Sequence, residues 1–360
     1  MKLIYKYILK KCFFNTSLLL FAFAIIYTVV QAIQELGSVG KGSYTTLSMF
    51  IYLGALLPSY IYLLIPLSVL IGVMTTMLGL VKNSEYAIMR TSGISLRDIT
   101  KILTIFGIIF AVITFAVGEV IAPESSHFAK IYKLNKTEER VSMDLTSGVW
   151  SKDGEETIVN VKNISSNNNA EISGIQIFMY DNNLALEERL TAESASYDSK
   201  QHVWVLSNVV DYKYVNGRME IEHNKTLNWK STIDPSYFSV LVISPDDMPA
   251  FHLFSYIKHL SHNHESTNRH EIAMWNKLLY PIACISMAFI AIGFIPNNGR
   301  NINLSTKLFA GIIIGVAFFF VNKLVGFMAT LYFWNPILSA SIPTALLFAI
   351  GWIIILKKEA

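Results

Sequence analysis

The sequence predicts an α-helical membrane protein with six transmembrane helices in two groups of three and an all-β domain inserted between the groups. Three observations carry this prediction: a hydrophobic fraction of 52% with only 15% charged residues, six long apolar stretches, and one polar segment between the third and fourth stretch. Soluble domains usually contain about 45–50% apolar and about 25% charged residues. The deviation from both values indicates a membrane protein.

A helix needs about 20 predominantly apolar residues to cross the hydrocarbon core of a bilayer. Six stretches meet this criterion, and they cover roughly residues 13–34, 49–81, 101–122, 273–295, 304–331 and 334–356. The apolar core of the first stretch is longer than that of a signal peptide, so we expect this helix to be retained.

The positions of Lys and Arg predict the orientation, because these residues accumulate in cytoplasmic loops. One side of the predicted bundle collects Lys2, Lys6, Lys10, Lys11, Lys82, Arg90, Arg97, Lys101, Arg300, Lys307, Lys357 and Lys358, whereas the opposite short loops contain Lys41 and little else. We therefore expect both termini in the cytoplasm and the β domain on the other side of the membrane.

The polar middle segment of roughly 140 residues is long enough for one soluble domain. Apolar, partly alternating runs predict strands at 157–161, 175–180, 204–206 and 209–214, with turns at 153–154, 167–169, 181–183 and 216–217. Short strands at this spacing indicate a sandwich, a jelly roll or an open β-roll.

The predicted organisation therefore has three parts. Residues 1–135 carry the first three spans, residues 136–250 form the β-jelly-roll-like domain, and residues 251–360 carry the last three spans. The third part begins with a short amphipathic helix at 251–264 that returns the chain to the membrane.

The turn between the second and third spans predicts a short helix at about residues 84–93. Ser84 can cap this helix and Glu85 suits its first turn, while Ser95 and Asp98 have capping-box spacing before the third span. A short helix with one acid and an apolar face suits docking in the groove of an ATPase. An ordinary capped turn on the membrane surface explains the same residues, and physical reasoning alone favours it.

Four lysines are candidates for binding an anionic lipid head group: Lys41 after the first span, Lys130 and Lys133 after the third, and Lys323 inside the fifth. Lys130 and Lys133 share a face if the third helix continues beyond the membrane. Lys323 lies on the order of 28 Å along its helix from Leu304, in the outer part of the span. Together they can form a cationic ring, although snorkelling to the interface is the alternative for each lysine.

Other classes of function lack support. The glycine-containing segment at 35–43 is no phosphate-binding loop, because the first glycine of that motif falls at Glu35. The spans contain no carboxylate pair, nucleophile–base set or metal motif, so we expect neither catalysis nor a bound cofactor. Any energy from ATP must therefore come from a partner ATPase, which would use ATP with Mg²⁺. The net charge of +3 gives no indication of nucleic-acid binding.

Two residue types remain. Histidines gather at His252, His259, His262, His264 and His270 without nearby carboxylate or cysteine partners, so we interpret them as solvated rather than as a metal site. Cys12 and Cys284 lie in or beside apolar stretches and are interpreted as structural.

Five segments resemble the LptF/LptG family of paired permeases, and in particular its LptG branch. They are ELGSVGKGSY (35–44), SEYAIMRTSG (84–93), GEVIAPE (118–124), GVWSKDG (148–154) and MWNKLLYP (274–281). The resemblance covers nearly the whole chain in order. One departure is the turn after the fourth span, which reads FIPNNGR (294–300) where family members often have FGPLR.

The resemblance implies one half of an LptF–LptG pair that two cytoplasmic LptB ATPases drive. The pair would extract lipopolysaccharide or lipooligosaccharide from the inner membrane, through lateral entry between the first span of one subunit and the fifth of the other. The lipid would then pass to a periplasmic β-jelly-roll bridge with LptC and LptA.

The resemblance also assigns residues. It places Glu85, Tyr86, Met89 and Arg90 in a coupling helix that contacts LptB. Lys130 and Lys133 match basic positions that face the lipid phosphates, whereas Lys41 lies within the glycine loop rather than before it. The alternatives are an LptF-type sister permease and, from a different class, a membrane-anchored scaffold or sensor.

Overall fold

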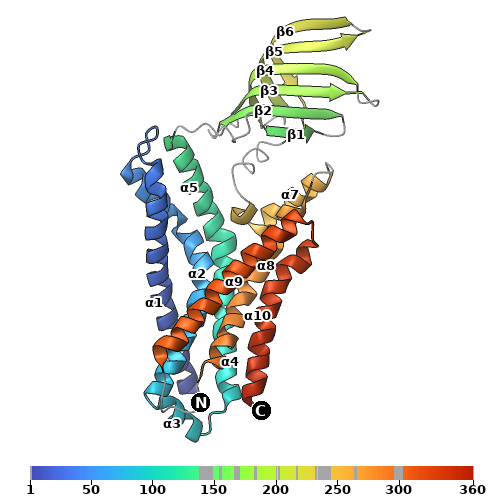
Figure 1. The fold of residues 1–360 in the computed structure, drawn as a ribbon. Coiled ribbons are helices and arrows are strands. Elements are labelled where there is room, and N and C mark those ends of the chain that lie inside the picture. Colours follow the sequence, from blue (N-terminus) through green and yellow to red (C-terminus); the bar gives the residue numbers. More distant parts are fainter. Residues whose placement is uncertain are drawn as a thin grey trace.

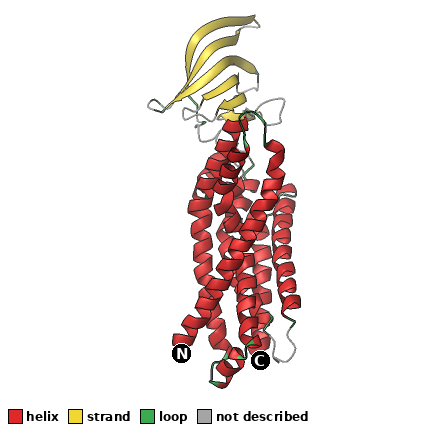
Figure 2. Ribbon diagram, turned by 90° about the vertical axis from the view of Figure 1, so that its left-hand side faces the viewer, coloured by secondary structure: helices red, strands yellow, loops and turns green. Residues whose placement is uncertain are grey.

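The computed structural model shows a long helical bundle with a curved β-sheet at one end (Figures 1 and 2). Both chain termini lie at the other end of the bundle, which we call the terminal end, opposite the sheet end. The structure describes residues 2–137, 149–153, 156–165, 171–181, 185–199, 201, 203–215, 218–231, 233, 245–262, 266–295 and 303–359.

The helices fall into two groups on either side of the sheet in the sequence. The first group contains α1 (Lys2–Glu35), η1 (Leu36–Ser38), α2 (Thr46–Lys82), α3 (Glu85–Thr91), α4 (Leu96–Ala116), η2 (Val117–Ile121) and α5 (Ala122–Thr137). The second contains η3 (Pro245–Asp247), α7 (Ala250–His262), α8 (Asn268–Gly293), α9 (Leu304–Leu331) and α10 (Pro336–Glu359). In the described residues six helical segments are long and apolar enough to cross a membrane, which confirms the six predicted spans.

Helix α2 forms the centre of the bundle. It is apolar on all sides, and 83% of its most apolar stretch is buried, as expected for a helix surrounded by other helices. Its buried side chains pack in one core with those of α4 and α8. Pro58 and Pro66 lie inside α2, where each removes one intrahelical hydrogen bond.

The third span is a single 42-residue segment in which α4, the π-helical turn η2 and α5 follow without interruption. At 1.5 Å per residue it is roughly 63 Å long, about twice the thickness of a hydrocarbon core. It is therefore long enough to extend past the membrane towards the sheet. This continuation is the condition under which Lys130 and Lys133 were expected to share a face. A Cβ at Gly118 would overlap the ring of Tyr62, so η2 packs tightly on α2.

The inserted domain is one antiparallel sheet whose six described strands follow each other in chain order. They are β1 (Val149–Asp153), β2 (Thr157–Ser165), β3 (Glu171–Tyr180), β4 (Leu186–Asp198), β5 (Val203–Val215) and β6 (Arg218–Trp229). The sheet curves around a small apolar core that includes the fully buried Trp204, whose Nε1 donates to the carbonyl of Ile233 at 2.8 Å. The predicted membrane protein with an inserted β domain is thus confirmed.

Local predictions had mixed outcomes. The capping box of Ser95 and Asp98 is present, and the returning helix exists as α7. Ser84 does not cap α3 with its side chain: its backbone is left-handed, with φ 62°, and its hydroxyl makes no capping hydrogen bond. Residues 154, 167–169, 182–183, 216–217 and 296–300, at or within predicted turns, lie outside the described residues.

Candidate functional site

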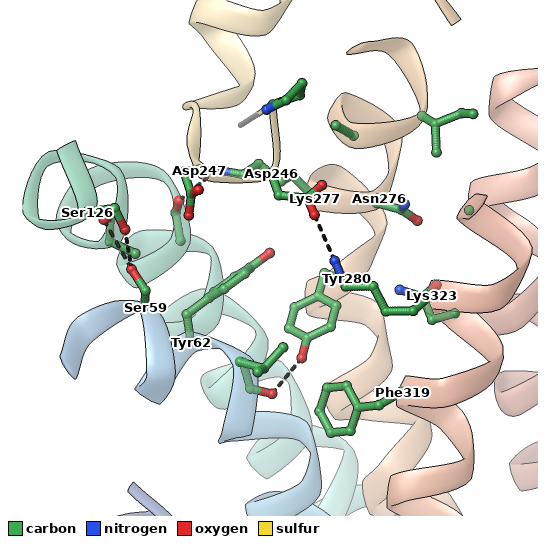
Figure 3. Close-up of a pocket in the computed structure, with 18 of the residues that line it drawn as sticks. Ser59, Tyr62, Ser126, Asp246, Asp247, Asn276, Lys277, Tyr280, Phe319 and Lys323 are labelled. Carbon is green, nitrogen blue, oxygen red and sulfur yellow. Dashed lines mark hydrogen bonds and ion pairs between the residues drawn. The ribbon is translucent and has the colours of Figure 1, made fainter. Parts of the chain in front are cut away.

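A cavity of about 580 Å³ lies at the sheet end of the bundle, between α2, η2–α5, α8 and α9 (Figure 3). The turn η3, which precedes α7, closes it on the side of the sheet. Its walls combine aromatic rings with charged groups, and they include Tyr62, Tyr280, Phe319, Asp246, Asp247, Lys277 and Lys323. A concave, mixed apolar and polar space of this size is typical of a ligand site.

Aromatic side chains fix one wall of the cavity. The rings of Tyr62 and Tyr280 are 4.9 Å apart, and the Tyr280 hydroxyl donates to the Leu63 carbonyl at 2.7 Å (Figure 3). On α5, Ser126 forms a 2.6 Å hydrogen bond with Ser59 of α2. These contacts join α2 to α5 and α8 across the cavity and hold its walls in place.

Two carboxylates of η3 join the opposite walls. The Asp247 carboxylate accepts from Lys130 Nζ of α5 at 2.6 Å. Asp246 accepts from Lys323 Nζ of α9 at 2.7 Å, as Figure 3 shows. The first pair is partly buried, with side-chain exposures of 28% and 26%, whereas the second is exposed at 70% and 62%. The turn is therefore tied on both sides, and the tie to α9 is the more solvated one.

Lys133 belongs to a different arrangement. It pairs with Glu35, at the end of α1, at 2.7 Å and lies 5.2 Å from the centre of the Tyr52 ring. The following loop docks on the end of α5, where the Ser43 amide donates to the Lys136 carbonyl at 2.8 Å. Lys41 lies exposed on this loop.

The structure thus divides the four predicted lysines. Lys130 and Lys323 flank the closing turn of the cavity, while Lys133 and Lys41 lie where α1 and its loop meet α5. The sequence did not reveal that Lys130, Lys133 and Lys323 each pair with a carboxylate.

Sequence reasoning also missed Lys277. This residue of α8 is only 7% exposed, lines the cavity, and donates to the Gly118 carbonyl of η2 at 3.4 Å. A lysine inside an otherwise apolar span is a signal for function. Glu119, which follows Gly118 in η2, accepts a hydrogen bond from the Ala250 amide at 2.6 Å and so fixes the start of α7.

At the terminal end, Glu85 links α3 to α1. Its carboxylate accepts from the Tyr7 hydroxyl at 2.8 Å and from Lys11 Nζ at 3.1 Å. The hydrogen bond from Tyr7, followed by the contact with Lys11, holds the pKa of Glu85 below its usual value. Glu85 is therefore ionised near neutral pH.

The other predicted coupling residues differ in exposure. Met89 is buried in the bundle core and Tyr86 is half-buried against it, so both anchor α3. Arg90 is exposed and donates to the Ile94 carbonyl at 3.2 Å. The most prominent apolar group on the outer face is Ile88, 64% exposed, which the sequence prediction did not include.

In the described residues, six helices long and apolar enough to span a membrane, an inserted sheet and a charged cavity at the sheet end of the bundle together fit a membrane permease subunit. The model of the family described as "Lipopolysaccharide export system permease LptF/LptG" matches residues 6–357 of the chain. The chain therefore belongs to the LptF/LptG family of lipopolysaccharide export permeases, which confirms the predicted resemblance and excludes a mere anchor for a sensor.

Similar proteins carry the LptG name. The lipopolysaccharide export system permease protein LptG of Escherichia coli K12 is 25% identical over 356 residues, which cover 98% of both chains. That of Haemophilus influenzae Rd is 24% identical over 331 residues, or 92% of both chains. These relatives agree with the LptG branch that the sequence segments favour over an LptF-type subunit.

Proposed function

We propose that this chain is the LptG-type half of a paired permease that takes lipopolysaccharide from the bacterial inner membrane. The observation that carries the proposal is the set of lysines at the sheet end of the bundle, where Lys130 and Lys323 flank the cavity and Lys133 lies between α1 and α5. Lysine ammonium groups at that level suit the phosphates of an anionic glycolipid. The β domain lies beyond the cavity, on the path that a departing lipid would take.

The orientation and partners complete the proposal. Both termini and α3 lie in the cytoplasm and the β domain in the periplasm, as the Lys and Arg distribution favours. LptF forms the other half, an LptB dimer hydrolyses ATP with Mg²⁺, and LptC and LptA continue the periplasmic bridge. The chain itself is non-catalytic in this scheme, and its ligands are glycolipid and membrane lipid.

Docking of the ATPase is tested by co-purification of LptB with variants of α3. Glu85→Lys is expected to reduce recovery of LptB at least tenfold, but it also breaks the internal pair with Lys11. The double variant Lys11→Glu with Glu85→Lys re-forms that pair in reverse and separates the two roles. Loss of LptB in both variants supports docking through Glu85, whereas full recovery in the double variant assigns Glu85 to internal structure.

Ile88 offers a second test on the same helix. Ile88→Asp leaves the internal contacts of α3 in place and is expected to reduce LptB recovery to a similar degree. Leu3→Asp is the matched control, because Leu3 is 84% exposed at the same end but lies on α1. Equal recovery from Ile88→Asp and Leu3→Asp would contradict docking on α3.

Lipid binding is tested with Lys130→Ala combined with Lys133→Ala. We expect weaker crosslinking of lipopolysaccharide, with the larger difference from wild type at low salt, where charges are less screened. Lys258→Ala is the control, since this exposed lysine lies on α7. Equal crosslinking of the double variant and wild type would leave these lysines with a snorkelling role only.

A further inference from the structure

Lys277 is a buried cation with an incomplete set of partners. It is 7% exposed, and within the described part of the chain its hydrogen bond is the 3.4 Å contact with the Gly118 carbonyl. An ammonium group has three donors, and leaving them unpaired away from water is costly. An anion in the cavity would supply the missing partners.

The acidic turn η3 lies on the same cavity. Asp246 and Asp247 both line it, and their carboxylates are bound by lysines from two walls, α9 and α5. Arg269, Lys277 and Lys323 also line the cavity, so the lining contains three cations and two carboxylates. A further carboxylate, that of Glu119, also acts on Lys277 but is engaged by the Ala250 amide. The two carboxylates of η3 therefore pair with ammonium groups that an incoming anion could bind in their place.

The mouth of the cavity adjoins an apolar surface. Phe327 of α9 lines the cavity and is 64% exposed, and Phe320 on the same helix is 66% exposed. An amphiphile can thus place acyl chains along α9 while its head group enters the cavity. This combination favours a lipid head group over a free anion.

We propose that this cavity binds the phosphate-bearing head group of the exported glycolipid, with Lys277 as its buried donor and η3 as a displaceable occupant. The inference rests on the proposed function and deepens it. When the phosphate arrives, Lys323 exchanges Asp246 for the phosphate, and the link between α9 and η3 opens. Because the exposed pair with Lys323 is the weaker tie, it opens before the pair of Lys130 with Asp247.

Photo-crosslinking tests the site in the complete transporter, reconstituted in nanodiscs with lipopolysaccharide. A benzophenone amino acid at position 327 reports on the cavity, and one at position 21 reports on the outer face of α1, where Phe21 is 70% exposed. We expect the adduct at 327 to fall at least tenfold in Lys277→Met and to stay within threefold of wild type in Lys277→Arg. Asp246→Asn should increase it, because a competing carboxylate is lost.

Lys277→Met leaves no unpaired charge on the lysine side and is expected to fold, which its melting temperature checks. An unchanged adduct at 327 in Lys277→Met would overturn the inference, as would equal labelling by dephosphorylated lipopolysaccharide. Equal labelling by phosphatidylglycerol would overturn the assignment to the exported lipid. An adduct at 21 without one at 327 removes this inference alone, whereas the lack of both removes the proposed function as well.

Discussion

Helices α1 and α9 both lie at the edge of the bundle, yet they are attached to the central helix α2 in different ways. Only 11% of the most apolar stretch of α1 and 17% of that of α9 are buried, so both expose apolar surface to lipid or a partner. Their contacts with α2 differ in kind.

Helix α1 contacts α2 backbone to backbone. A Cβ at Gly72 would overlap Thr16 Oγ1 and lie 2.6 Å from Thr16 Cα. Beside this contact, the Asn15 side-chain amide donates to Thr76 Oγ1 at 2.8 Å. Ion pairs tie α1 at both ends, to α3 and to α5.

Helix α9 contacts α2 through the tips of side chains. Gly315 faces Leu67 Cδ1, and a Cβ at Gly311 would lie 2.6 Å from Met74 Sδ. Such flexible ends can rearrange at little cost, and the pair of Lys323 with Asp246 is solvated. We infer that α1 is the fixed wall of the permease and α9 the movable one.

Gly72→Ala should give the largest effect, because the new Cβ would meet the backbone of Thr16. Overpacking of this kind costs about 1–3 kcal/mol, and we expect a loss near the upper end in the free energy of unfolding. Thermal unfolding in mild detergent measures it. Gly79→Ala on the same helix is the control, because nothing lies within 4 Å of its Cβ.

Gly315→Ala is the matched change on α9. Since the added Cβ meets only the movable end of Leu67, we expect a loss below about 1 kcal/mol. A loss as large as that of Gly72→Ala would mean that α9 is as rigidly seated as α1, and the comparison would fail.

Lys133→Met should give the second-largest loss of stability, after Gly72→Ala. It leaves the Glu35 carboxylate, only 12% exposed, without its cation. Removing one partner of a fully buried pair costs about 3–5 kcal/mol, so we expect about 2 kcal/mol for this partly exposed one. Adding Glu35→Gln should restore most of the loss, and a double-mutant cycle measures the coupling; additive losses would contradict a fixed tie between α1 and α5.

The tie between α1 and α3 should depend on pH. The native pKa of Glu85 is lowered, so its contribution is present above the ordinary pKa of glutamate, about 4.3, and is lost as the pH falls through the native value. The melting temperatures of wild type and Glu85→Gln should therefore differ near pH 7 and converge towards pH 3. A difference that persists at low pH would assign the effect to something other than the charge of Glu85.

Some of this architecture follows from local sequence. A span needs a long apolar run, and a capping box needs two side chains three residues apart, so the spans and the Ser95–Asp98 cap were predictable. Ser84 shows the limit of such rules, because its residue type suits a cap while its backbone adopts a left-handed turn.

The charged site depends on distant segments. Lys130 and Asp247 are 117 residues apart in the chain, Lys133 and Glu35 are 98 apart, and Lys323 and Asp246 are 77 apart. No periodic pattern links positions at such separations. The sequence could therefore predict which residues carry the positive charge, but the fold determines which carboxylates neutralise them.

Lys323→Met should have the smallest effect on stability. Its pair with Asp246 is 70% and 62% exposed, and exposed pairs contribute about 0–1 kcal/mol. We therefore expect a nearly unchanged melting temperature but a freer outer end of α9, which spin labels on α9 and α5 would detect as a broader distance distribution. A large loss of stability would show that this ion pair seats α9 firmly, and an unchanged distribution would show that other contacts hold α9 in place. Either result would contradict the role of α9 as the movable wall.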